Sequence, residues 1–402
     1  MVTSVSLTLQ KIYEDLHAHP ELSHSEHRTA GIAAAWLREH GFAVHEGIGG
    51  TGVAGVLVNG DGPTVLLRAD MDALPVQEAT GLPYSSTVDG VMHACGHDVH
   101  VTCLLGASAE LVAKRTQWRG TVVVVFQPAE ETASGAQSMI DDGLYDSVPR
   151  PDVVLGQHVA PLPAGFLGLR PGAAFAATDS LRVTLYGRGG HGSRPEATVD
   201  PVVLAAATVM RLQTVVSREV AGGDTAVLTV GASNAGTKAN IIPDHAELLL
   251  NVRSYDPAVR KRVLEAIHRI VSGEAQAANS PKEPLIEPFE SAPAVINDPT
   301  ASARTRTALE SVVGKGHVVD PGPVTGSEDV GVLAAAAEAP IVFWLLGGAD
   351  PALFAGASSV AEMATVMADL PSNHSPQFAP LPAPTLDIGV AALVAAATAW
   401  LG

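Results

Sequence analysis

The sequence predicts an α/β protein in which a mainly parallel mixed sheet is flanked by helices and a smaller α+β unit is inserted. Short apolar runs alternate with helical periodicities up to residue 158 and again after residue 298, as in a parallel sheet covered by helices. Between these parts the order changes to strand, helix, strand, strand, helix, strand, as in a ferredoxin-like unit. The length of 402 residues also exceeds what one hydrophobic core usually serves. We therefore expect a first domain of residues 1–178 and 292–402 and an inserted domain of residues 179–291.

Two helices are expected at the N-terminal end. Apolar residues have helical spacing over residues 7–19, and Pro20 ends this pattern. Ser25 and Gly41 are residue types that begin and end helices, so a second helix is expected at 25–40.

Residues 120–126 are nearly all apolar, as in a strand buried on both faces. The other elements expected before the insertion are strands at 42–46, 52–58, 64–68 and 152–158, and helices at 99–115 and 135–142.

The inserted unit is bounded by Pro171-Gly172 and Pro293, residue types that are common in domain linkers. Its expected strands are 180–186, 225–230, 246–252 and 284–289, and its expected helices are 201–217 and 257–278. The chain then returns to the first domain with a helix at 298–313, a strand at 340–346 and an alanine-rich helix at 385–400.

The charge balance restricts the class of partner. The chain has 24 basic and 42 acidic residues, and its net charge of -18 argues against nucleic acid or an anionic membrane. With only two cysteines, Cys95 and Cys103, a disulfide framework is not expected, and a reducing compartment fits better. No signal-peptide pattern and no run of roughly 18 apolar residues is evident, so a cytoplasmic protein is expected.

Candidate metal ligands follow the predicted strands. In parallel sheets functional groups gather beyond the carboxyl ends of strands, and thiolate, imidazole and carboxylate groups lie at these positions. The candidates are Cys95, His97, Glu131, His158 and His374. Five such ligands exceed what one tetrahedral ion needs and suit two metals joined by a bridging group, for which Cys95 is the candidate. A thiolate favours zinc or cobalt, whereas the other ligands also accept manganese or nickel.

Motifs in family order along nearly the whole chain resemble those of the aminoacylase and N-acyl-amino-acid amidohydrolase family of dinuclear metallohydrolases. This family includes hippurate hydrolases and auxin-conjugate hydrolases. The matching segments are RADMDALP at 68–75, MHACGHD at 92–98, QPAEE at 127–131, GGHG at 189–192, NIIP at 240–243, GSED at 326–329 and NH at 373–374.

The resemblance implies a metallopeptidase-like catalytic domain and an inserted lid or dimerisation domain. Cys95 would bridge two divalent ions, with His97 and His158 completing one site and Glu131 and His374 the other. Glu130 would be the general base toward a water between the ions. In the inserted domain, His191 would stabilise the oxyanion of the tetrahedral intermediate. Asn240 and Arg253 would hold the substrate, and Arg253 would do so by binding the carboxylate of its amino-acid part.

The expected activity is hydrolysis of N-acyl-amino-acid conjugates to a carboxylic acid and an amino acid, by a homodimer acting on a small molecule. A dipeptidase or a biosynthetic amino-acid deacetylase would share the same metal core. A non-catalytic metal- or ligand-binding protein is an alternative of another class, although a base such as Glu130 would have no use there.

Other polar residues near these motifs receive simpler interpretations. Asp72 is expected to orient a metal ligand, and Cys103 is expected to lie in a helix interior. His93, Asp98 and His100 could support the site or be structural, and the sequence does not decide between these roles. His17, His19, His24 and His27 are expected to be surface histidines, because no carboxylate lies at ligand spacing from them.

Overall fold

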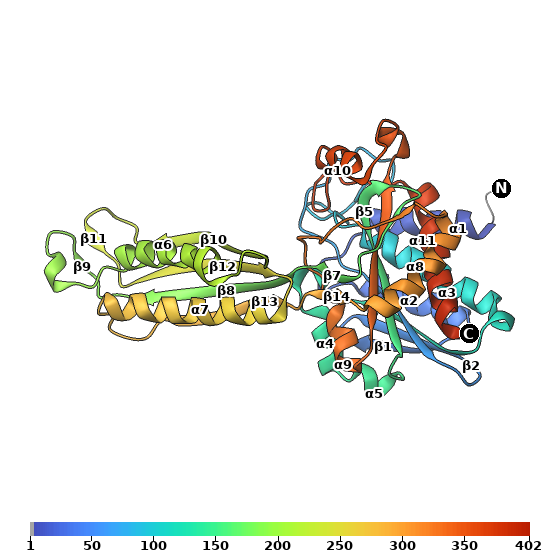
Figure 1. Cartoon of the computed structure of the whole chain (residues 1–402), viewed down its shortest axis with the longest axis horizontal. Helices are drawn as coiled ribbons and strands as arrows, with labels where there is room; N and C mark the ends of the chain where they lie inside the picture. The colour runs from blue at the N-terminus through green and yellow to red at the C-terminus, as the bar shows by residue number, and fades with distance from the viewer. Residues whose placement is uncertain (1–3) are drawn as a thin grey trace. The chain divides into compact units, whose positions relative to one another are not determined.

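A computed structural model describes residues 4–402, and the chain divides into two compact units (Figure 1). The first unit contains the residues up to Ala174, Val295–Pro323 and Asp329–Gly402. The second contains Phe175–Ala294 and the short segment Val324–Glu328. Each unit has its own hydrophobic core.

An eight-stranded mixed sheet forms the centre of the first unit, in the order β1-β2-β4-β3-β5-β16-β6-β15. Its middle strands β4, β3, β5 and β16 are parallel to one another, which confirms the expected mainly parallel sheet. The valines of β4 are buried on both faces, as expected from the apolar run. The strands are β1 (Ala43–Ile48), β2 (Gly52–Asn59), β3 (Thr64–Asp70), β4 (Gly120–Gln127), β5 (Val153–Pro163), β6 (Leu167–Gly168), β15 (Val318–Val319) and β16 (Ile341–Ala349); β7 (Gly172–Phe175) and β14 (Val295–Asn297) form a separate pair.

Helices cover both faces of this sheet (Figure 1). One face packs against α3 and α11, and the other against α4 and α9. The helices are α1 (Ser4–Ala18), α2 (His27–Glu39), α3 (His97–Ala113), α4 (Gly135–Asp141), α5 (Leu144–Ser147), α8 (Pro299–Val313), α9 (Gly331–Ala337), α10 (Val360–Ala368) and α11 (Pro382–Leu401), with short 3-10 turns η1 (Arg115–Gln117), η2 (Glu130–Thr132) and η4 (Pro351–Phe354).

Helix α11 corrects one expectation from the sequence. Its 20 residues contain an 18-residue window that is long and apolar enough to cross a membrane. In the structure 56% of that window is buried, and α11 packs against α3 and α8. Leu386, Val390 and Leu393 belong to the core of the first unit. Burial within the core therefore explains the composition of this helix.

The start of α2 also differs from the expected helix. Ser25 was expected to cap the helix, but Glu26 occupies the N-cap position and makes no capping hydrogen bond. The fully buried Glu26 side chain is turned inward instead, where it accepts hydrogen bonds from Thr51 and from the backbone of Ala129.

The second unit has the ferredoxin-like order of elements that the sequence predicted. Its antiparallel sheet has the order β10-β12-β8-β13, and two helices bury its apolar face. Asp200 and Asp256 cap these helices, and each is followed by proline at the first helical position. The elements are β8 (Ala177–Tyr186), β9 (Gly190–His191), η3 (Pro195–Ala197), α6 (Pro201–Glu219), β10 (Ala226–Ala235), β11 (Ile241–Ile242), β12 (His245–Ser254), α7 (Pro257–Ala277) and β13 (Leu285–Ala292).

Candidate metal centre

The polar centre of the first unit lies at the carboxyl ends of β3 and β4, beside the middle of the neighbouring parallel strand β5. β3 ends at Asp70, η2 begins with Glu130 three residues after the end of β4, and β5 carries His158. Because β3 pairs with both β4 and β5, these chain ends meet at one edge of the sheet. Gly96 reverses the chain just before α3, with a φ of 82° that favours glycine, and so directs the first turn of α3 toward the same edge.

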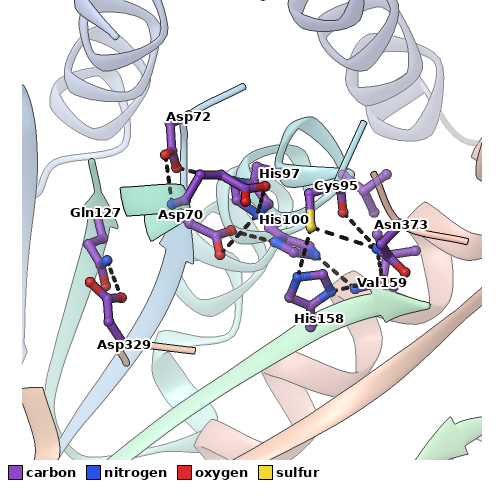
Figure 2. Close-up of polar contacts among 12 residues, drawn as sticks. Asp70, Asp72, Cys95, His97, His100, Gln127, His158, Val159, Asp329 and Asn373 are labelled. Carbon is purple, nitrogen blue, oxygen red and sulfur yellow. Dashed lines mark hydrogen bonds and ion pairs between the residues drawn. The ribbon is translucent and has the colours of Figure 1, made fainter. Parts of the chain in front are cut away.

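The structure brings the five candidate ligands together. Cys95 Sγ lies 3.5 Å from His158 Nε2 (Figure 2). His97 Nε2 lies 3.8 Å from Glu131 Oε1. His374 Nε2 lies 3.3 Å from the other oxygen of Glu131. The donor atoms of Cys95, His97 and Glu131 are all within 4.8 Å of one another.

Each of two histidines uses one ring nitrogen for a hydrogen bond and turns the other toward the cluster. His97 donates from Nδ1 to Asp72 at 3.2 Å, as expected for an orienting carboxylate. His158 donates from Nδ1 to the Val159 carbonyl at 2.8 Å. When each ring is neutral, its Nε2 therefore carries the lone pair that a cation would need.

His100 has a different role from its neighbour His97. Its Nδ1 donates to Asp70, and its Nε2 accepts the Val159 N–H at 2.8 Å (Figure 2). Both ring nitrogens are thus used, although the donor atoms of Asp70, His97, His100 and His158 lie within 4.8 Å of one another. His100 supports the site by joining the end of β3 to the middle of β5, which resolves the role that the sequence left open.

Two buried atoms that could each bind a metal ion favour the presence of cations. His97 Nε2 and Glu131 Oε1 are buried and form no hydrogen bond with any residue in 4–402. Buried polar atoms are rarely left in this state in native proteins unless an ion or water satisfies them. The donor set of one thiol, three imidazoles and a carboxylate is also one that zinc and related divalent ions prefer. The residues present therefore fit divalent cations.

The electrostatic field of the cluster favours positive charge. Hydrogen bonds to Cys95 and Glu131 raise the pKa of His374 to about 10. Burial lowers the pKa of His97, but the charge of Asp70 and the hydrogen bond to Asp72 outweigh this effect and raise it well above the ordinary value. Burial and the charge of Glu131 raise the pKa of the Cys95 thiol. A bound cation would satisfy the same field and keep the thiolate ionised.

Asn373 fixes the position of Cys95. Its side-chain amide donates to the Cys95 and Val159 carbonyls, each at 3.1 Å, and approaches Cys95 Sγ at 3.8 Å (Figure 2). His374, the next residue, donates its backbone N–H to the Ala94 carbonyl at 2.8 Å. This late segment is therefore held directly against the loop before α3.

The turn that carries Glu130 and Glu131 is held by carboxylates from distant segments. Glu26 accepts the Ala129 N–H at 2.8 Å, and Asp72 accepts the Glu131 N–H at 3.0 Å. The Glu130 side chain is 9% exposed, and one of its oxygens lies within 4.8 Å of an Asp329 oxygen. The two adjacent glutamates thus have different neighbours.

The sequence interpretation missed some supporting residues. Ser23 donates to Asp72 at 2.7 Å, and the Glu26 contact described above was not expected. The prediction of a surface position was wrong for His17, which is 1% exposed, whereas His24 and His27 are exposed. The available signal was helical spacing, because His17 follows the buried Tyr13 by four residues on the same face. Cys103 is buried in α3, as expected.

The other predicted site residues, His191, Asn240 and Arg253, lie in the second unit. β9 pairs with β11, and the Gly192 N–H donates to the Asn240 carbonyl at 2.9 Å, so His191 and Asn240 belong to adjoining chain segments. Both are exposed. Arg253 is half-buried on β12, and it donates to the Asn251 side chain, the Ser327 hydroxyl and the Thr325 carbonyl.

Comparisons with known proteins agree with this arrangement. Residues 66–372 match the model of the peptidase family M20/M25/M40. The hippurate hydrolase of Campylobacter jejuni is 42% identical over 80% of this chain and 84% of its own length, and the N-acetyl-L-cysteine deacetylase of Bacillus subtilis is 38% identical over 80% and 77%. The solved structure of the Bacillus subtilis YXEP protein, described as a dinuclear metal-binding M20 peptidase, is 28% identical, with a TM-score of 0.76 over 99% of both chains.

Proposed function

Because the chain belongs to the peptidase family M20/M25/M40 and is an amidohydrolase, we propose that it hydrolyses the amide bond of N-acyl amino acids. The products would be a carboxylic acid and an amino acid. The observation that carries this proposal is the convergence of five donor side chains, two of which have buried atoms without a hydrogen bond. Hippurate and N-acetylcysteine, named for two relatives, are both N-acyl amino acids.

Two divalent ions would be held by Cys95, His97, Glu131, His158 and His374, with the Cys95 sulfur between them. Such ions supply Lewis-acid polarisation of a carbonyl and lower the pKa of water. The thiolate and the three imidazoles suit zinc or cobalt, and manganese or nickel remain alternatives. The relative described as a dinuclear metal-binding peptidase supports the number of ions.

Glu130 would act as the general base and then as the general acid. Its carboxylate would take a proton from the attacking water as the water oxygen bonds to the amide carbon. It would then give this proton to the amide nitrogen as the carbon–nitrogen bond breaks. The contacts of Glu131 with His97 and His374 leave proton transfer to the adjacent carboxylate.

His191 would stabilise the negative charge that develops on the carbonyl oxygen. The Ser193 N–H donates to His191 Nδ1 at 3.1 Å, so the neutral ring carries its proton on Nε2. An exposed N–H of this kind can donate to an oxyanion. Asn240 would hold the substrate beside it.

Arg253 would bind the carboxylate of the amino-acid part. Its hydrogen-bond partners are an amide oxygen, a hydroxyl and a carbonyl, and it forms no ion pair with any described residue. The guanidinium therefore keeps a net positive charge that a substrate carboxylate can neutralise. In this proposal the second unit closes over the first as a lid during catalysis.

A homodimer formed through the second unit is part of the proposal. Strand β10 is at the edge of its sheet, and α6 beside it exposes Val203 and Met210 by 65% and 72%. An open strand edge next to apolar side chains is suited to pairing with a second copy. We also propose a cytoplasmic location, which the free cysteines favour.

The test is a substrate panel combined with metal analysis of the purified protein. The panel contains acyl-glycine, acyl-glutamine, acyl-aspartate and aromatic acyl conjugates together with free dipeptides. We expect about two divalent ions per chain and turnover of the acyl conjugates. Turnover of dipeptides alone would favour the dipeptidase alternative, and selective turnover of one acetylated amino acid would favour a biosynthetic deacetylase. Bound metal without any hydrolysis would favour a binding protein.

A further inference from the structure

His17 is a buried charged residue that the proposed mechanism does not use. It lies near the end of α1, is 1% exposed, and its ring packs against those of Tyr13 and Tyr84 at centroid distances of 5.8 and 5.5 Å. Its two ring nitrogens face two carboxylates. Nδ1 lies 2.6 Å from Asp98 Oδ2, and Nε2 lies 3.3 Å from Glu78 Oε1.

This geometry defines the charge of the His17 ring. An ionised carboxylate has only acceptors, so both ring nitrogens must donate and the ring must carry two protons. The side chains of Asp98 and Glu78 are 1% and 3% exposed, so the contacts are shielded from water. Buried contacts of this kind hold their partners in one arrangement, because a buried charge without a partner is costly.

The two carboxylates belong to two different segments of the metal centre. Asp98 follows His97 in the first turn of α3 and also accepts the Val99 N–H at 2.9 Å. This joins His17 directly to the turn that presents the His97 ring.

Glu78 belongs to the irregular segment 74–92 between β3 and α3. Its second oxygen accepts the Ser86 N–H at 2.6 Å, which closes the segment on itself. The next residue, Ala79, donates its N–H to the Pro376 carbonyl at 2.8 Å, two positions after His374. These hydrogen bonds, together with the peptide bond between Glu78 and Ala79, connect His17 through segment 74–92 to the segment that carries His374.

We propose that His17 is a positioning residue that holds the His97 turn and the His374 segment at a set separation. This inference rests on the proposed metal centre, to which it adds a residue outside the ligand set. Because His97 and His374 both approach Glu131, a change in their separation would change the coordination geometry of any ion bound there.

The experiment compares His17→Gln and Glu78→Gln with the control His19→Gln in the full-length protein. His19 directly follows the same helix, but its side chain is 45% exposed, and its Nδ1 contacts the carbonyl and the carboxylate of Asp15 on that helix. Cobalt(II) is titrated into metal-free protein, its affinity and visible absorption spectrum are recorded, and amide hydrogen exchange is measured without metal.

For His17→Gln we expect a cobalt affinity about tenfold weaker, a changed spectrum, and faster exchange in segments 74–92 and 373–378. Glu78→Gln keeps an acceptor for the ring, so a smaller change in the same direction is expected, and this variant serves if His17→Gln does not fold. His19→Gln should match the original protein. Unchanged affinity, spectrum and exchange in both test variants would overturn the inference.

The same titration separates this inference from the proposed function. If the original protein binds two cobalt ions and hydrolyses acyl conjugates while His17→Gln is indistinguishable from it, the positioning role alone fails. If the original protein binds no cobalt, the metal centre itself fails, and the role of His17 falls with it.

Discussion

The two units differ in how they hold most of their proposed functional side chains, although the ligand His374 of the first unit is exposed and Arg253 of the second is half-buried. In the first unit His97, Asp72 and Asp70 are buried, and each has hydrogen-bond or ion-pair partners on other segments. In the second unit His191 and Asn240 are exposed on short strands and turns, and among residues 4–402 the ring of His191 forms hydrogen bonds only with the nearby Ser193. A buried network suits ions that stay bound, whereas exposed groups suit a substrate that must enter and leave. Substitutions in the two units should therefore have different consequences.

The largest effect is expected for Glu130→Gln in the first unit. Loss of the proton-transfer group should lower kcat by about 10^4-fold, while the metal content stays unchanged, because the amide keeps the shape of the side chain. Steady-state kinetics and elemental analysis of the same preparation measure both quantities. Glu338→Gln, in a glutamate at the end of α9, is the control and should leave kcat unchanged. An unchanged rate for Glu130→Gln at equal metal content would remove the base from the mechanism.

The second prediction concerns stability against pH for His17. Burial lowers the pKa of His17, but the hydrogen bonds and charges of Asp98 and Glu78 outweigh it, so the net pKa is raised above 6.5. Burial raises the pKa of Glu78, but its bonds with Thr80, Ser86 and His17 outweigh it, so the net pKa is lowered below 4.5. The His17 contribution is complete below pH 6.5 and is lost as pH rises through its folded pKa. The Glu78 contribution is complete above pH 4.5 and is lost as pH falls.

Denaturant unfolding of the original protein and His17→Gln in the presence of a chelator tests these signs. The difference in free energy of unfolding should be about 3 kcal/mol between pH 4.5 and 6.5 and should decline above and below this window. The exposed pair of His245 and Asp244 in the second unit gives the contrast: solvent screens this pair, so His245→Gln should change the free energy of unfolding far less than His17→Gln does. A difference for His17→Gln that is constant from pH 4 to 9 would contradict the assignment.

The fold and the candidate ligands were predictable because their signals are local. Apolar runs such as 120–126 mark buried strands, and polar residues just after them mark one edge of a parallel sheet. The sequence named His97 as a candidate ligand but left the role of His100 open, because local patterns do not show which groups its ring nitrogens contact. The role of His100 depends on Val159, which lies on β5, far away in the sequence. Its backbone N–H donates a hydrogen bond to Nε2 of His100, so this nitrogen is not free to bind a cation.

Residues that act through long-range partners were the ones missed. Glu26 resembles a residue of an exposed helix start, but its carboxylate accepts the Ala129 N–H, more than one hundred positions away. Nothing in the sequence around His17 reveals that it pairs with Asp98, which lies 81 positions later. Only its helical spacing from the buried Tyr13 predicts that it is buried. Pairings across such separations are set by the tertiary fold, which local patterns do not determine.

The third prediction concerns His191 in the second unit. His191→Ala should lower kcat by about 10^2-fold through loss of one oxyanion donor, and it should leave the melting temperature unchanged because the side chain is exposed. His245→Ala, an exposed histidine of the same unit, is the control. Calorimetry and kinetics together test the comparison. A clear fall in melting temperature would show that His191 has a structural role instead.

The smallest effect is expected for Arg253→Met, which tests whether the second unit recognises the carboxylate of the substrate. Methionine keeps much of the side-chain volume but removes the charge, so KM for an acyl-glycine should rise about tenfold with little change in kcat. The corresponding acyl-glycinamide lacks the carboxylate, so its KM should not change. Arg182→Met is a matched control, because Arg182 lies on the neighbouring strand β8 but is already paired with Glu247. An equal rise in KM for both substrates would mean that Arg253 supports the fold of the sheet. The proposed substrate-contacting residues of the second unit would then be His191 and Asn240 alone.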